Sequence, residues 1–315
     1  MAKLFQYKGE DMPKVTLISV KGNSYICSGF LSIGVYVHGT SAILIDSGGD
    51  ESCAKDVSNG LEQAGYVVTA IINTHCHPDH CGGNAYFQKK YPDIRIYATH
   101  DEQRFIEDTD LAPRCFCGQA QPFSGLLNKY IAPQKSSTVT NVIAPYQDQI
   151  IMVGDVSFKV ITLPGHTPGS IGIITPDNVL YTGDAIFGEQ TFAKHYMLFY
   201  THIGNTLASL KKLTELKIDA FALYHGGVVE NLESLAQQHI GRVLETKNTI
   251  VAFLQKQSLS IDQLTQKIMQ FHNIPNNMVS FVLTQTTVRA YLAQLELEKA
   301  IVLGVQDGML LASIS

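Results

Sequence analysis

Residues 74–83 read THCHPDHCGG, and they directly follow the apolar run 67–73 (VVTAIIN), which is typical of a strand. His75 and His77 are two apart in extended chain, so both side chains point the same way and can bind one ion. Asp79 and His80 follow, and because they are adjacent in sequence they diverge from the first pair. The spacing therefore predicts a site at the end of a strand for two metal ions, which in such sites lie roughly 3.5–4 Å apart.

Three further metal-binding candidates also come directly after apolar runs that predict strands. The runs cover residues 158–163, 179–181 and 220–224, and the candidates that follow them are His166, Asp184 and His225. Glycines stand beside each candidate and allow tight turns and a close approach of the backbone to an ion.

Residues 15–235 resemble the metallo-β-lactamase superfamily, whose ligand positions are all filled in this chain. The resemblance implies an α/β fold, a four-layer αββα sandwich with metals at one edge between two sheets. It implies that the first metal is held by His75, His77 and His166, and that the second is held by Asp79, His80 and His225. Asp184 would bridge the two ions. Asp46, which follows the apolar run 43–45, matches an aspartate that usually supports the ligands from behind.

The implied chemistry is hydrolysis at a dinuclear metal centre. Two divalent ions outweigh the charge of Asp79, Asp184 and a bridging hydroxide, so the site stabilises an oxyanion and lowers the pKa of water towards about 7. Asp79 is the expected catalytic residue, because it can orient the nucleophile and pass a proton to the leaving group. Zinc is the expected ion, and iron and manganese also suit imidazole and carboxylate ligands.

The expected substrate is a small molecule with an ester, thioester or lactone bond. Glyoxalase II enzymes share the HxHxDHxGG segment but usually carry His where Ser170 stands. One alternative is RNA phosphodiester cleavage, as in the endoribonuclease-like branch with a similar C-terminal tail. Another is a persulfide dioxygenase with one iron, which shares a segment like residues 165–169, but its Gly-Arg-Thr-Asp stretch is missing after Asp184. A purely binding role is disfavoured by the complete ligand set.

The C-terminal part predicts a second domain. Helices are expected over residues 242–257, 260–271 and 278–299, followed by a hairpin whose turn is Asp307-Gly308. This order resembles a winged-helix module, so we predict domains at 1–241 and 242–315. The second contains six Lys+Arg and five Asp+Glu, a balance that argues against nucleic-acid binding. Substrate cover or a contact between subunits, as in a homodimer, is the favoured role.

Composition adds further limits. The chain has 315 residues, a formal net charge of -5 and no run of apolar residues long enough for a membrane helix. The N-terminal residues 1–14 lack the apolar region of a secretory signal, and six cysteines are too few for a disulfide scaffold. We therefore expect a cytoplasmic protein that does not bind membranes.

Several residues have two interpretations. His195, Tyr196, Tyr200 and His202 either line the substrate pocket or pack around a helix expected at 204–217, so no substrate contact is assigned. The irregular segment 101–150 is a lid, a binding loop or a dimer contact. We interpret Cys76 and Cys81 as buried thiols and Cys115 and Cys117 as loop residues. Among the remaining histidines, His38, His100, His239 and His272 match no ligand pattern.

Overall fold

Two β-sheets form the centre of the computed structural model, which describes residues 15–27, 29 and 31–315. The first sheet has the order β1-β2-β3-β4-β5-β6-β7, and the second has the order β13-β12-β11-β10-β9-β8. The strands of the first sheet are β1 Leu17–Lys21, β2 Ser24–Cys27, β3 Gly34–His38, β4 Ser41–Ile45, β5 Val67–Ile72, β6 Arg95–Thr99 and β7 Asn141–Ile143. Those of the second are β8 Gln149–Val153, β9 Val156–Thr162, β10 Ile171–Ile174, β11 Val179–Tyr181, β12 Ala220–Leu223 and β13 Gly227–Val229. Residues 1–14, which the sequence predicts to lack a secretory signal, lie outside the described residues.

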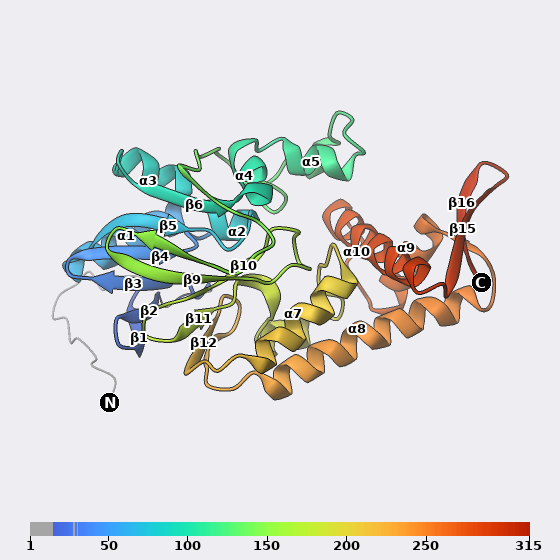
Figure 1. Cartoon of the computed structure of the whole chain (residues 1–315). Helices are drawn as coiled ribbons and strands as arrows, with labels where there is room; N and C mark the ends of the chain where they lie inside the picture. The colour runs from blue at the N-terminus through green and yellow to red at the C-terminus, as the bar shows by residue number, and fades with distance from the viewer. Residues whose placement is uncertain (1–14, 28, 30) are drawn as a thin grey trace.

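Helices cover the outer faces of both sheets (Figure 1). The helices of this part are α1 Glu51–Gln63, α2 Pro78–Cys81, α3 Asn84–Lys90, α4 His100–Glu107, α5 Leu111–Phe116, α6 Glu189–Lys194, α7 Ile203–Glu215 and α8 Glu233–Leu254, with 3-10 turns at Ser124–Leu126 and Gly183–Ala185. Among the described residues, no helix is both long and apolar enough to cross a membrane.

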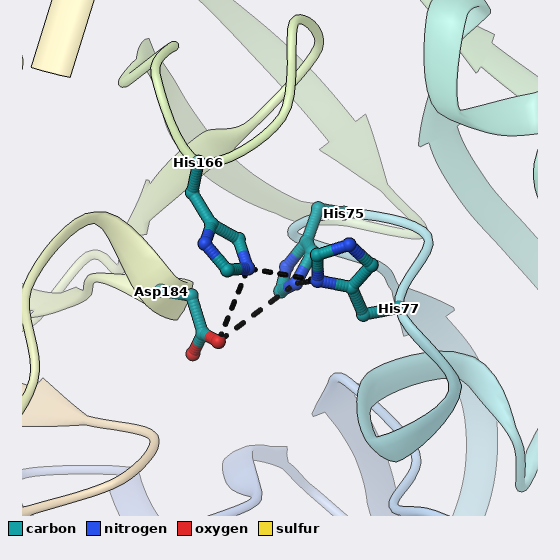
Figure 2. A group of neighbouring side chains, drawn as sticks. All are labelled: His75, His77, His166 and Asp184. Carbon is teal, nitrogen blue, oxygen red and sulfur yellow. Dashed lines mark hydrogen bonds and ion pairs between the residues drawn. The ribbon is translucent and has the colours of Figure 1, made fainter. Parts of the chain in front are cut away.

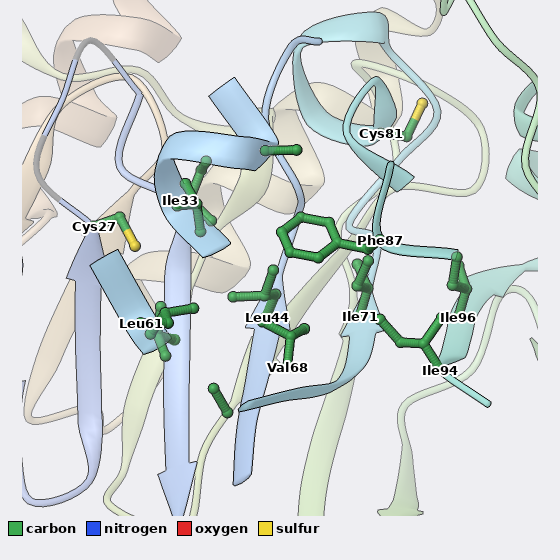
Figure 3. Packing of buried hydrophobic residues seen from close by; sticks show 14 of the residues in the cluster. Cys27, Ile33, Leu44, Leu61, Val68, Ile71, Cys81, Phe87, Ile94 and Ile96 are labelled. Carbon is green, nitrogen blue, oxygen red and sulfur yellow. The ribbon is translucent and has the colours of Figure 1, made fainter. Parts of the chain in front are cut away.

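Three apolar cores join the layers. Between the sheets, Tyr36 and Ile43 of the first sheet pack with Phe158 and Val160 of the second. On the outer face of the first sheet, Leu61 of α1 and Phe87 of α3 cover strand residues that include Leu44, Val68, Ile71 and Ile96 (Figure 3). On the outer face of the second sheet, Leu210 of α7 and Leu235 of α8 pack on Leu180. The four-layer αββα sandwich is therefore confirmed.

The predicted elements match closely where the sequence pattern is regular. Strand β5 covers residues 67–72, and every second residue at its start faces the core. The helix expected at 204–217 is α7, Ile203–Glu215, whose first turn is capped by His202: Nδ1 accepts from the Asn205 backbone N–H at 3.1 Å. His202 therefore stabilises the start of α7, which agrees with the interpretation that it packs at this helix rather than against substrate.

The C-terminal part contains β14 Leu259–Ser260, α9 Ile261–Phe271, α10 Met278–Leu297, β15 Ile301–Gln306 and β16 Met309–Ile314. Its sheet has the order β14-β16-β15, and Asp307 and Gly308 both have positive φ, as a two-residue hairpin turn requires. The expected helices and hairpin are present, and the winged-helix assignment stays a prediction.

The helix expected to begin at Arg242 begins earlier, at Glu233, so this predicted limit was wrong. Helix α8 runs through Gly241 because its buried stripe continues across this residue, with each half packed against a different core. Leu235 packs on the second sheet, whereas Val243 and Ile250 pack in the C-terminal core. That core also includes Phe187 and Tyr200 from the sandwich part, so the two predicted domains share packing across residue 241.

Candidate metal centre

All seven predicted ligands lie at one edge of the sandwich, just after strands end. His75 and His77 follow β5, His166 follows β9, Asp184 follows β11 and His225 follows β12. The pairs β4–β5 and β11–β12 are parallel, so their carboxyl ends meet at this edge. The side chains form two groups, one with His75, His77, His166 and Asp184 and one with Asp79, His80 and His225.

The first group brings three imidazoles to a common point (Figure 2). Nδ1 of His77 lies 3.1 Å from Nε2 of His75 and 2.8 Å from Nε2 of His166. Oδ2 of Asp184 lies 3.3 Å from Nε2 of His166. Three ring nitrogens and one carboxylate oxygen thus converge, which is a donor set that suits zinc.

The second group faces the other oxygen of Asp184. Its Oδ1 lies 3.1 Å from Nε2 of His80 and 3.5 Å from Nε2 of His225. Oδ2 of Asp79 lies 3.2 Å from Nε2 of His225. Asp184 therefore directs one carboxylate oxygen to each group, as a bridging residue does.

The residues present fit a cation. Nε2 of His80 and Oδ1 of Asp184 are buried and have no hydrogen-bond partner of acceptable geometry. Unsatisfied buried polar atoms destabilise a fold by about 1–3 kcal/mol each, so such atoms facing one another indicate a ligand between them.

The pKa values of the histidines differ between the two groups of ligands. Burial lowers the pKa of His75, and it lowers that of His166 to about 4, so these rings are neutral, the form that binds metal. Burial also acts on His80 and His225, but Asp184 outweighs it and raises the pKa of His225 to about 9 and that of His80 well above its usual range. Protons on these two rings balance the carboxylates, and a cation would replace them.

Asp46 lies behind the second group. Its Oδ2 lies 2.8 Å from Nδ1 of His80, and it also accepts from Thr74: the backbone N–H at 2.7 Å and Oγ1 at 2.8 Å. Asp46 is buried and has a φ of 64°, a conformation that costs energy for a residue with a side chain. Its contacts orient His80 with Nε2 towards the centre, as the family resemblance implied.

Two glycines allow these loops to pack. A Cβ at Gly83 would lie 2.2 Å from the carbonyl oxygen of Ser47, so the end of the 74–83 stretch can lie against the loop after β4. Gly183 has a φ of 52°, and a Cβ there would lie 2.7 Å from Oγ1 of Thr74. Both positions hold ligand loops together where any side chain would clash.

Glu102 is a residue of this centre that the sequence did not reveal. Its buried carboxylate accepts from the Cys76 backbone N–H at 2.9 Å, from Thr167 Oγ1 at 2.7 Å and from the Gly169 backbone N–H at 2.8 Å. It therefore joins the loop of His75 and His77 to the loop of His166. The signal available in the sequence was its position shortly after a parallel strand at the same edge.

Two cavities meet at the centre, of about 280 Å³ and 1080 Å³. Residues that line both are Pro78, Asp79, Tyr130, His166, Phe199 and Leu283. His195 and Tyr196 line the larger cavity, whereas Tyr200 is buried in the C-terminal core. The segment 101–150, which includes α4 and α5, supplies walls of both, which agrees with a binding segment.

The cysteines singled out in the sequence lie outside the two ligand groups. Burial raises the pKa of Cys76 and Cys81 well above the usual range, and neither belongs to the two ligand groups. The prediction that Cys115 lies in a loop was wrong, because it lies in α5 and lines the smaller cavity. Among the described residues, neither Cys115 nor Cys117 belongs to a potential metal group.

The chain is similar to several solved and curated proteins. A metallo-beta-lactamase family protein from Thermus thermophilus matches with a TM-score of 0.70 at 18% identity, over 96% of this chain and 99% of that one. A beta-lactamase domain protein from Burkholderia ambifaria matches with a TM-score of 0.73 at 15% identity, over 97% and 96%. These likenesses show the fold.

Curated relatives match over a shorter range. A hydroxyacylglutathione hydrolase of Rhodopseudomonas palustris (strain BisB5) is 29% identical over 170 residues, 53% of this chain and 51% of that protein. An atrochrysone carboxyl ACP thioesterase of Passalora fulva is 24% identical over 210 residues, 64% and 51%. The chain thus spans about half the length of these two relatives. The family model of the metallo-beta-lactamase superfamily matches residues 29–225, which include every ligand candidate described above. The chain belongs to the metallo-beta-lactamase superfamily.

Proposed function

We propose that the chain is a metal-dependent hydrolase with two divalent ions, zinc foremost, that cleaves an ester, thioester or lactone bond of a small molecule. The observation that carries this proposal is the carboxylate of Asp184, which directs Oδ2 to His166 at 3.3 Å and Oδ1 to His80 at 3.1 Å. Relatives named hydroxyacylglutathione hydrolase and atrochrysone carboxyl ACP thioesterase support the bond type.

The ligands would be divided as the two groups are. His75, His77 and His166 would hold one ion, Asp79, His80 and His225 the other, and Asp184 both. When bound, the ions would polarise the substrate carbonyl and lower the pKa of water to about 7, which supplies a nucleophile at neutral pH.

Asp79 is placed to move the proton. Its side chain is 42% exposed and lines both cavities, so it reaches substrate as well as the centre. Burial opposes ionisation, but His80 and His225 lower the pKa of Asp79 to about 2, so it is a carboxylate at neutral pH. Its backbone carbonyl accepts from Tyr224 Oη at 2.6 Å, which fixes its position. It can orient water, accept a proton and give that proton to the leaving group.

The test is hydrolysis of p-nitrophenyl esters, thioesters and lactones by the zinc-loaded chain. His77→Ala and Asp184→Ala should each lower kcat/KM by at least a thousandfold, while circular dichroism shows the same fold. His38→Ala, an exposed histidine outside the centre, is the control and should keep full activity. Turnover retained in either ligand variant contradicts the proposal.

A further inference from the structure

We propose that the smaller cavity is an acyl-binding pocket, so that the preferred substrates are esters or thioesters of an apolar acyl group of medium size. This proposal rests on the proposed hydrolase function and names the substrate class of the same site. It starts from the position of the cavity, which reaches His77, Asp79 and His166 at the metal centre.

The walls of this cavity are mainly apolar and come from three distant parts of the chain. The metal loop supplies Pro78, the segment with α4 and α5 supplies Phe105 and Phe116, and α10 supplies Leu283. Phe199 closes the side next to His166, where the two rings are 5.7 Å apart in an edge contact. An apolar group attached to a carbonyl at the centre would be surrounded by these side chains and removed from water.

The charged groups at the cavity are already engaged. Its described lining residues include no Lys or Arg, and its carboxylates are Asp79 and Glu102. Asp79 faces His225, and Glu102 accepts three hydrogen bonds from the ligand loops. A charged or strongly polar acyl group would therefore lose its water without gaining a partner, whereas an apolar one would lose nothing.

The size of the cavity limits the length of the acyl group. Its volume is about 280 Å³, whereas a dry cavity of about 150 Å³ binds benzene. We therefore expect acyl groups of roughly six to ten carbons, or an aromatic acyl group of similar volume. The wall is fixed by packing, because Leu126 and Ile131 are buried against Val282 of α10. Because these walls cannot move apart easily, a larger side chain in the cavity should directly reduce the binding of long acyl groups.

The larger cavity is the complementary half of the site. It contains Lys129, Lys194 and His195, so it suits a larger and more polar leaving group. In the reaction, hydroxide from water bonds to the carbonyl carbon and the carbon–oxygen or carbon–sulfur bond breaks. The bonding electron pair leaves with the alcohol or thiol, which takes the proton that Asp79 accepted from water. The products are the carboxylic acid and the alcohol or thiol.

The test is kcat/KM of the zinc-loaded chain on p-nitrophenyl acetate, butyrate, hexanoate, octanoate and dodecanoate, with the leaving group held constant. We expect a rise of about threefold per methylene, at least tenfold from acetate to hexanoate, and a fall by dodecanoate. Thr286→Phe on α10 and Ala112→Phe on α5 should each lower the octanoate-to-acetate ratio at least tenfold.

Ala293→Phe is the matched control, since it adds the same ring on an exposed position of α10 and should leave the ratio unchanged. Zinc content and circular dichroism identify any variant that has not folded. If one wall variant fails to fold, the other wall variant tests the proposal. If kcat/KM does not depend on acyl chain length, or if the octanoate-to-acetate ratio is unchanged in both wall variants, the acyl-binding pocket is wrong. The proposed hydrolase function is then unaffected. Absence of turnover on every ester and thioester overturns both.

Discussion

Oδ1 of Asp184 lies 3.1 Å from Nε2 of His80, and both atoms are buried without a hydrogen-bond partner. Without a metal, a proton on His80 is what balances Asp184 here. Because Asp79 adds a second carboxylate to the same space, a cation would replace this proton with a larger positive charge. The stability of the chain should therefore depend on its metal.

Chelation should lower the melting temperature. Metal bound to the folded state alone stabilises it by about 4 kcal/mol at a thousandfold excess over the dissociation constant, and its removal leaves the carboxylates balanced only by protons on His80 and His225. Differential scanning fluorimetry with and without chelator should show a drop of several degrees, which added zinc reverses. Asp184→Asn should show a smaller drop. An identical melting temperature with and without chelator would count against a bound cation.

Asp46→Asn should weaken zinc binding about 10–100-fold while the fold persists. Asn tolerates the positive φ of Asp46, but its amide cannot supply the negative charge 2.8 Å from Nδ1 of His80. Competition with a chromophoric chelator measures the affinity. Asp93→Asn, at an exposed carboxylate outside both ligand groups, is the control. Zinc affinity within twofold of the parent chain would show that Asp46 does not support His80.

Much of this centre could be predicted from sequence because its ligands follow strands at fixed spacing. His75, His77, Asp79 and His80 lie within six residues, so local geometry alone divides them between the two groups of side chains. The pairing of β11 with β12, which brings Asp184 near His225, is long-range, and only the family resemblance supplied it.

Other features have no local pattern. Glu102 lies in an ordinary amphipathic helix, and its role comes from loops 26 and 65 residues away that donate to it. The course of α8 through Gly241 was missed for a similar reason. An isolated glycine costs about 1 kcal/mol in a helix, and the tertiary packing of Leu235 and Ile250 on either side outweighs that cost.

Glu102→Gln should destabilise the zinc-loaded chain by about 1–3 kcal/mol, because an amide NH₂ would face a backbone N–H or hydroxyl donor. Urea unfolding measures the free energy. Glu215→Gln changes an exposed carboxylate of α7 in the same way and should have little effect. Equal midpoints for the Glu102 and Glu215 variants would refute the joining role of Glu102.

Acid should destabilise the chain through His239. Burial lowers the pKa of His239 to about 4, and its ring accepts from the Phe187 N–H at 3.2 Å and donates to Leu235 O at 2.8 Å. Between pH 6.5 and 4 the unfolded chain binds a proton there and the folded chain does not, so stability present above pH 6.5 is lost as pH falls. The loss should be about 2 kcal/mol between pH 7 and pH 5.

Urea unfolding of the metal-free chain at these two pH values tests this expectation. His239→Gln should show a smaller difference between pH 7 and pH 5 than the parent chain, while His38→Gln, on an exposed histidine, should match the parent. The same pH dependence in the parent chain and in His239→Gln would exclude His239 as its source.

The most direct test of the central claim is the metal content of the full chain, purified without added metal or chelator and measured by mass spectrometry. The account predicts about two zinc or manganese ions per chain, and about one in Asp184→Ala. One iron per chain would contradict it and would favour the mononuclear dioxygenase chemistry instead.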